Sequence, residues 1–200
     1  RMMTTYIRPG GLWRDVPVEF EGAVRHLLEI MPARIKEYES MLTKNPLFLE
    51  RTKEIGIITQ EECLQYAISG PVARGSGMAY DLRKARPYCG YETYAFDIPT
   101  QTEGDIYARY LVRVEEMRQS LRIIKQAMDR LPLGPVRSKN YKFVPPPRSE
   151  IGVSMEALIH HFKLWTEGFS APRGYVYAAT ESPRGELGAY MEGDGGPKPY

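Results

Sequence analysis

Three long segments of the chain repeat their apolar residues every three or four positions, the spacing of one helix face. They run from Val16 to Lys44, from Gly104 to Leu131 and from Ser154 to Phe169. Pro32 interrupts the first, and because proline removes a backbone hydrogen bond and clashes with the preceding turn, we expect a kink there or two helices end to end. The last helix is expected to bury one side, made of Met155, Leu158, Ile159, Phe162, Trp165 and Phe169.

Shorter elements are predicted between the first two helices. Pro46 suits the first turn of a short helix through Leu49. The apolar run at 55–58 is typical of a short extended strand. Thr59 and Glu62 have the spacing of a capping box, which predicts a helix over residues 60–68.

The remaining segments lack a helical period. The alternating stretches 175–179 and 186–191 predict a β-hairpin whose loop is 181–185. Residues 69–102 are expected to form a long ordered loop, and loops of this length are usually functional or interfacial. The connector 136–151 is polar, and its three consecutive prolines must be extended. We therefore predict a mainly α, α+β fold with long core helices, in a single domain over residues 1–200.

Composition and charge narrow the class of protein. An apolar content of 42% and a charged content of 26% are typical of a globular protein. The 27 basic residues exceed the 25 acidic ones by only two, so nucleic acid is not an expected partner. Cys63 and Cys89 lie far apart without metal-ligand spacing, so we expect free thiols and no iron–sulfur cluster bound by this chain. The chain starts at Arg1 and stops just after a glycine-rich turn, and we expect it to be an internal fragment of a longer one.

Two charged motifs lie in the predicted central loop. Arg74-Gly-Ser-Gly could cradle a phosphate, but it lacks the Walker lysine and the full GxGxxG pattern, which favours a simple turn. The cluster that follows, Asp81, Arg83, Lys84 and Arg86, carries both charges. Such groups mostly form exposed or interfacial ion pairs, and a subunit contact is the second interpretation.

No reaction follows from the other polar motifs. His160 and His161 are neighbours, about 100° apart on a helix, so they cannot face one metal ion. We expect one of them to be hydrogen-bonded at the edge of the core and the other to face outward. Glu181, Arg184 and Glu186 are expected to form ion pairs, because no base or nucleophile accompanies them. On the residues alone, a scaffold or interaction module would fit equally well.

Several long strings of the chain resemble one family in the same order. The strings are Tyr6-Ile-Arg-Pro-Gly-Gly11, Arg74-Gly-Ser-Gly77 with Asp81-Leu-Arg-Lys84, the segment from Tyr110 to Lys125, the segment from Ser154 to Gly168, and the segment from Glu181 to Gly188. This family is the D subunit of NADH:quinone oxidoreductase, the large quinone-site subunit of respiratory complex I. The resemblance covers essentially the whole chain.

The resemblance implies a core subunit of the peripheral arm. Such a subunit packs against the one that holds the terminal iron–sulfur cluster, and together they form the site where electrons from NADH reduce quinone, a ubiquinone in some members, coupled to proton translocation. NADH is used by other chains of the complex, and membrane-arm subunits are further partners. The implied location is peripheral, on the cytoplasmic face of a bacterial plasma membrane or the matrix face of the mitochondrial inner membrane.

The resemblance also bears on particular residues. The family's quinone ligands, a histidine in a GPQHP-like string and a later tyrosine, do not occur in this chain, so no catalytic residue is expected and the isolated fragment should be inactive. Met3, Arg8, Gly10 and Gly11 are expected near the partner's iron–sulfur cluster. Members commonly have histidine where Met3 stands, and a thioether cannot take up a proton, so redox-linked protonation is not expected there.

Two further implications concern interfaces and nickel. Arg74, Asp81, Arg83 and Lys84 are expected to contact neighbouring subunits. The family is related to the large subunits of nickel–iron hydrogenases, so the alternative function is the large subunit of a membrane-bound complex of that kind. Hydrogenases hold nickel with two CxxC motifs, which this chain lacks, and no metal is expected here.

Overall fold

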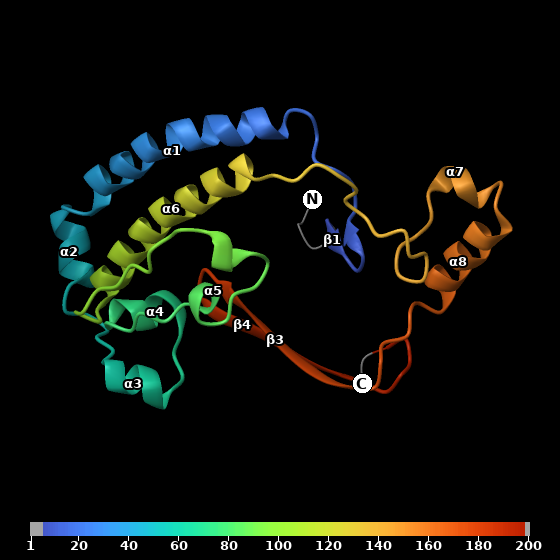
Figure 1. The fold of residues 1–200 in the computed structure, drawn as a ribbon. Helices are drawn as coiled ribbons and strands as arrows, with labels where there is room; N and C mark the ends of the chain where they lie inside the picture. The colour runs from blue at the N-terminus through green and yellow to red at the C-terminus, as the bar shows by residue number, and fades with distance from the viewer. Residues whose placement is uncertain (1–5, 199–200) are drawn as a thin grey trace. The chain divides into compact units, whose positions relative to one another are not determined.

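A computed structural model describes residues 6–198 of the chain (Figure 1). Contacts within the described residues divide them into two compact units. The first comprises residues 6–18, 132–177 and 190–198, and the second comprises residues 19–131 and 178–189. Both strands of the C-terminal hairpin have residues in each unit. The single domain over residues 1–200 therefore stays a prediction.

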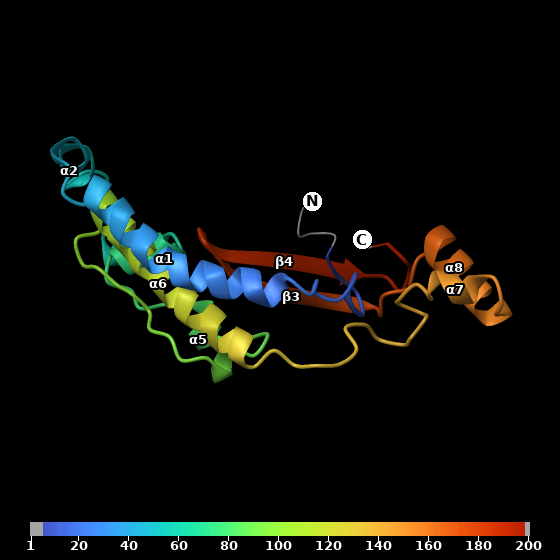
Figure 2. The same cartoon turned by 90° about the horizontal axis from the view of Figure 1, so that it is seen from above.

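Two long helices form the core of the second unit. Helices α1 (Phe20–Leu42) and α6 (Ile106–Asp129) lie side by side in both views (Figures 1 and 2). Their packing buries Ile35 of α1 and Val114 of α6, which confirms the predicted helices and the inward face of α6. Helix α1 continues through Pro32, so the alternative of two separate helices is wrong.

Two short helices follow α1 and begin at side-chain caps. Helix α2 (Pro46–Thr52) starts with proline in its first turn, as predicted. Helix α3 (Gln60–Gln65) has the predicted capping box, in which the Thr59 hydroxyl accepts from the Glu62 N–H. The strand predicted at 55–58 is wrong, because Ile58 N–H donates to the Gly104 carbonyl in irregular backbone instead of pairing with a strand.

The segment predicted as a loop over residues 69–102 contains three short helices. They are α4 (Gly70–Gly75), α5 (Leu82–Ala85) and η2 (Tyr91–Thr93). Arg74 lies in α4, so the Arg74-Gly-Ser-Gly motif ends a helix and is more than a turn. Helices of one turn or so show no hydrophobic period, because they depend on tertiary contacts.

The first unit begins with a small antiparallel hairpin that was not predicted. Strand β1 (Ile7–Arg8) pairs with β2 (Gly11–Leu12) through a turn at Gly10, whose φ of 84° suits glycine. Gly11 also forms a bridge with Arg137 of the proline-containing connector. The connector is therefore attached to the hairpin.

Helices α7 (Arg148–Ile151) and α8 (Met155–Thr166) pack together in the same unit. Helix α8 has the predicted extent within a few residues, but the prediction of its buried side is wrong. Ala157 is its buried residue, and the predicted apolar side is exposed, with Trp165 71% exposed. A hydrophobic period shows that a helix has an apolar side, and the described residues of this unit do not cover that side.

The chain ends in the predicted β-hairpin, formed by β3 (Gly174–Ser182) and β4 (Gly185–Gly193). Its turn is Pro183-Arg184, narrower than the predicted loop. The mainly α, α+β fold class is confirmed. Among residues 6–198, the structure contains no helix with the length and apolar character needed to cross a membrane.

Candidate functional site

Three of the sequence motifs meet in one buried cluster of charges in the second unit. Arg74 of α4 lies at its centre and is 1% exposed. Its Nε donates to Oε1 of Glu116, on α6, at 2.8 Å, and its Nη1 donates to Oε1 of Glu181, on β3, at 3.0 Å. Nη1 also donates to the carbonyl of Tyr80. The guanidinium thus joins segments that are far apart in the sequence.

A second ion pair adjoins Arg74. Asp81 is equally buried, and its Oδ2 lies 3.8 Å from Nη1 of Arg74. The same carboxylate accepts from Nη2 of Arg83 at 2.6 Å and from the Arg83 backbone N–H at 2.8 Å, which caps helix α5. Asp81 therefore fixes both the start of α5 and the side chain of Arg83.

Close backbone contact brings the tip of the C-terminal hairpin to this cluster. Gly70 and Gly185 both have positive φ, and a Cβ atom on Gly70 would overlap the Cα of Gly185. Beside them, Ser69 Oγ accepts from the Glu186 N–H at 2.8 Å. The two glycines allow the hairpin to approach α4 closely enough for Glu181 to reach Arg74.

The cluster holds three carboxylates and two guanidinium groups. Burial raises the pKa of the Glu116 carboxyl, although the Arg74 charge opposes this. Burial alone would raise the pKa of Asp81 as well, but hydrogen bonds from Arg83 and the charges of both arginines hold it below its ordinary value. The neutral form therefore costs less at Glu116 than at Asp81.

An open cavity of about 640 Å³ lies beside the cluster, within the second unit. The cluster itself forms part of its wall, through Arg74, Arg83, Glu116 and Glu181. Most of the apolar side chains of the wall come from α1 and α6: Leu27, Met31, Tyr110, Val114, Met117, Leu121 and Ile124. The paired charges are held in fixed positions, which suits a structural role better than acid–base exchange.

The structure corrects part of the prediction for these charges. Arg74 and Asp81 are both buried within the chain, so the expectation of an exposed ion pair is wrong for Asp81. Arg83 is half-buried, and Lys84 is exposed with its ammonium group 4.5 Å from the centre of the Phe96 ring. The contact of these residues with other subunits stays a prediction.

Glu116 was missed by sequence analysis. It lies four residues after Val112, which is buried on α6, so the helical spacing places it toward the same side. A glutamate one helical turn after a buried valine is the one local signal. The expected ion pair of Glu181 is confirmed, with Arg74 as its partner.

The residues expected near the partner's cluster lie in the first unit, except that Met3 falls outside the described residues. Arg8, Gly10 and Gly11 belong to the β1–β2 hairpin. The guanidinium of Arg8 lies 5.6 Å from the centre of the Trp13 ring. A Cβ atom on Gly10 would overlap the side chain of Val144, so glycine is needed for the hairpin to pack on the connector.

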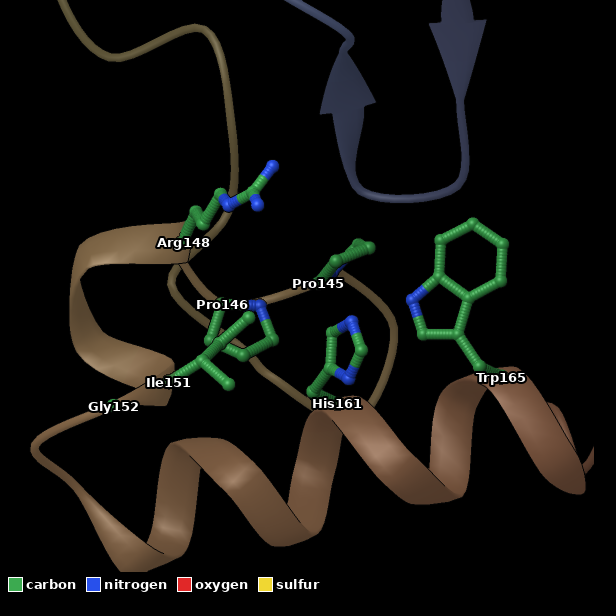
Figure 3. A pocket seen from close by; sticks show the side chains of 7 residues that line it. All are labelled: Pro145, Pro146, Arg148, Ile151, Gly152, His161 and Trp165. Carbon is green, nitrogen blue, oxygen red and sulfur yellow. The ribbon is translucent and has the colours of Figure 1, made fainter.

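Two adjoining cavities open on this side of the first unit. One, of about 200 Å³, is lined by the hairpin, the prolines of the connector, Arg137 and Trp165. The other, of about 530 Å³, is shown in Figure 3, where His161 and Trp165 project from α8 toward Pro145. Arg148, at the start of α7, lines both cavities.

The two neighbouring histidines point to different neighbours. His160 is half-buried, its ring lies against Tyr141, and its Nε2 is 3.7 Å from Glu156. His161 is also half-buried and lines the open cavity of Figure 3, and the outward orientation of one of the two stays a prediction. Within residues 6–198, no three side chains of histidine, cysteine, aspartate or glutamate come together as a metal site.

Comparison with known proteins identifies the family. Residues 1–200 match the family described as respiratory-chain NADH dehydrogenase, 49 Kd subunit. The chain belongs to this family, which confirms the resemblance seen in its sequence motifs.

The similar proteins carry the corresponding names. The chain is 58% identical over 203 residues to the D 1 subunit of NADH-quinone oxidoreductase from Roseiflexus castenholzii and 55% identical over 203 residues to the D 2 subunit from Chloroflexus aurantiacus. It is 50% identical over 200 residues to NADH-quinone oxidoreductase subunit 4 of Thermus thermophilus. Each comparison covers 100% of this chain and 49% of the relative, so the chain spans about half the length of these relatives.

Proposed function

We propose that this chain is part of a core subunit of an NADH-quinone oxidoreductase. Together with the subunit that holds the terminal iron–sulfur cluster, it would form the site where electrons from NADH reduce quinone, coupled to proton translocation. The observation that carries the proposal is the similarity over every residue of the chain to subunits of that enzyme. NADH and the iron–sulfur clusters belong to other chains of the complex.

Within such a complex, the two described sites have different roles. The hairpin with Arg8, Gly10 and Gly11, together with Met3, lies near the partner's iron–sulfur cluster. The buried charges around Arg74 hold the inner part of the second unit together, and the exposed Lys84 contacts a neighbouring subunit. The complex is attached to the membrane through its membrane-arm subunits, and this chain is peripheral.

The experiment is purification of the assembled complex from the host through an affinity tag on the gene that encodes this chain. We expect the tagged subunit to bring with it iron–sulfur subunits and NADH-dependent quinone reduction. NADH-dependent quinone reduction should be lost when the gene is deleted and restored when the deletion strain is complemented with the gene. Purification of a nickel-containing complex with hydrogen uptake, and without NADH-dependent quinone reduction, would contradict the proposal.

A further inference from the structure

One face of the first unit gathers arginine and tryptophan side chains. We define the arginine–tryptophan face by Arg8, Trp13, Arg137, Arg148 and Trp165, which line the cavity of about 200 Å³. The other lining residues are glycine, proline, leucine and valine, and none is acidic. The chain as a whole has a net charge of only +2, so this concentration of positive charge is local.

Two of these guanidinium groups are held in place within the unit, Arg137 by a backbone carbonyl and Arg8 by an indole ring. Arg137 donates from Nε to the Leu12 carbonyl at 2.7 Å, which leaves its terminal nitrogens directed away from that bond. Arg8 is stacked on Trp13. Because the β1–β2 hairpin also pairs with Arg137 through Gly11, these groups are positioned before any ligand arrives.

Within residues 6–198, neither Arg137 nor Arg148 forms an ion pair. Arg148 also makes no side-chain hydrogen bond there, although it stands beside the cavity (Figure 3). A guanidinium presents its donors in a fork that matches a carboxylate. Two such groups at one small cavity suit a carboxylate ligand.

The apolar part of the face suits a polypeptide. Trp165 is 71% exposed and Trp13 is 45% exposed. The prolines at 145–147 line the smaller cavity, and the first two of them also line the larger one. Exposed tryptophan and arginine are the residues that contribute most to protein interfaces. Grooves lined by aromatic side chains are a common means of binding extended peptides.

We propose that the arginine–tryptophan face binds an extended acidic segment of a partner subunit, with a carboxylate in the cavity between Arg137 and Arg148. The flanking residues of the segment cover the indole rings. The inference rests on the proposed function, because the partner is a subunit of the same enzyme. Charge complementarity selects an acidic segment, since every ionisable side chain of the smaller cavity is an arginine.

The first test uses a photoreactive residue in the purified complex. His161→p-benzoylphenylalanine places the reactive group in the cavity of Figure 3 without changing an arginine or tryptophan of the face. Irradiation followed by mass spectrometry should give a crosslink to a segment of another subunit that contains aspartate or glutamate. A crosslink only to lipid, to a segment without acidic residues, or to no other chain would overturn the proposal.

The second test compares two charge reversals in the complete subunit. Arg148→Glu should reduce the fraction of subunit in the assembled complex about tenfold, measured by native electrophoresis. Lys139→Glu changes the net charge equally at an exposed position outside both cavities, and it should leave assembly unchanged. Replacing the crosslinked acidic residue of the partner by arginine should restore assembly of the Arg148→Glu subunit.

The two proposals fail in different ways. If the unmodified subunit fails to assemble with NADH-dependent quinone reduction, the proposed function is wrong. The unmodified subunit can assemble with this activity while the docking proposal fails. The proposal of an acidic docking segment alone is wrong if the Arg148→Glu and Lys139→Glu subunits assemble equally, or if the arginine substitution in the partner does not restore assembly. Arg148 is exposed and makes no side-chain bond in residues 6–198, so thermal unfolding of the variant subunit should match that of the parent.

Discussion

At the scale of single residues, Arg74 has the largest expected effect on stability. It is a charged side chain with almost no exposed surface, and Glu116 and Glu181 depend on it for their counter charge. A protein with a buried ion pair is often no more stable than one in which apolar side chains replace all the members of the pair. Removing one member is costly, because it leaves buried charges unpaired.

We expect Arg74→Met to lower the free energy of unfolding by about 3–5 kcal/mol. The methionine fills much of the volume but provides none of the donors to Glu116 and Glu181. Urea unfolding followed by circular dichroism measures the difference. Arg51→Met is the matched control at an exposed position, and it should change the free energy by less than about 0.5 kcal/mol. Equal losses in the two variants would show that the buried pairs contribute nothing.

The burial of Arg74 could not be predicted from local sequence. The nearby Asp81 and Arg83 carry opposite charges, and such local pairs are usually exposed to solvent, so the sequence predicts exposure here. Its burial depends on Glu116 and Glu181, which lie 42 and 107 positions away. No spacing rule joins residues at such distances, although the order of the family's strings marked all three segments.

At the scale of elements, the contact between Gly70 and Gly185 determines whether the β3–β4 hairpin can reach α4. Gly70 has a φ of 72°, and its missing Cβ atom leaves the space that the Gly185 backbone occupies. An alanine would be strained by its own backbone and would also push the hairpin away. The hydrogen bond from Arg74 to Glu181 would be lost with it.

We expect Gly70→Ala to lower the free energy of unfolding by about 2 kcal/mol or more, since overpacking and positive φ both oppose it. Gly22→Ala is a suitable control, because it lies in α1 with open space around it. In that exposed helix the same substitution should raise the free energy by about 0.5–1 kcal/mol. Urea unfolding of both variants measures the two changes. If Gly70→Ala leaves the free energy of unfolding unchanged, the contact between Gly70 and Gly185 is not tight.

The long helices were predicted from their period, whereas short elements were predicted only where a proline or a cap marked their start, as in α2 and α3. Helices α1, α6 and α8 extend over several turns, so their period is visible in the sequence. Helices α4 and α5 are too short to show one: α5 begins at the Asp81 cap, and α4, which has no side-chain cap, depends on tertiary contacts. The small β1–β2 hairpin has two residues in each strand, too few for an alternating pattern.

At the scale of the whole molecule, much apolar surface stays exposed, most clearly on α8. Leu158, Ile159, Phe162 and Trp165 are all more than a third exposed on one helix. The sequence correctly predicts that these residues share a side, but it contains no information on which polypeptide covers them. An apolar surface of this kind is typical of a chain that functions with other chains.

We expect Phe162→Ser to reduce self-association of the isolated chain while leaving its free energy of unfolding nearly unchanged. Phe162 is 65% exposed, and serine and phenylalanine have similar helix propensities. Sedimentation velocity at several concentrations measures the association. Val18→Ser removes another exposed apolar side chain, outside α8, and should have no such effect. If both variants self-associate as strongly as the parent chain, this side of α8 does not mediate the association.

The charged cluster also has a consequence for how the chain reaches its native state. The Glu181 carboxylate pairs with Arg74 across 107 positions, and the backbone N–H of Glu186 donates to the Ser69 hydroxyl across 117. Contacts of such separation require the closure of a long loop before they give any stabilisation, so they form late and slow the folding reaction. During synthesis, Arg74 leaves the ribosome long before Glu181. Until then, the inner part of the second unit holds a cation with only part of its counter charge, and its folding is completed only when a segment made more than a hundred residues later arrives.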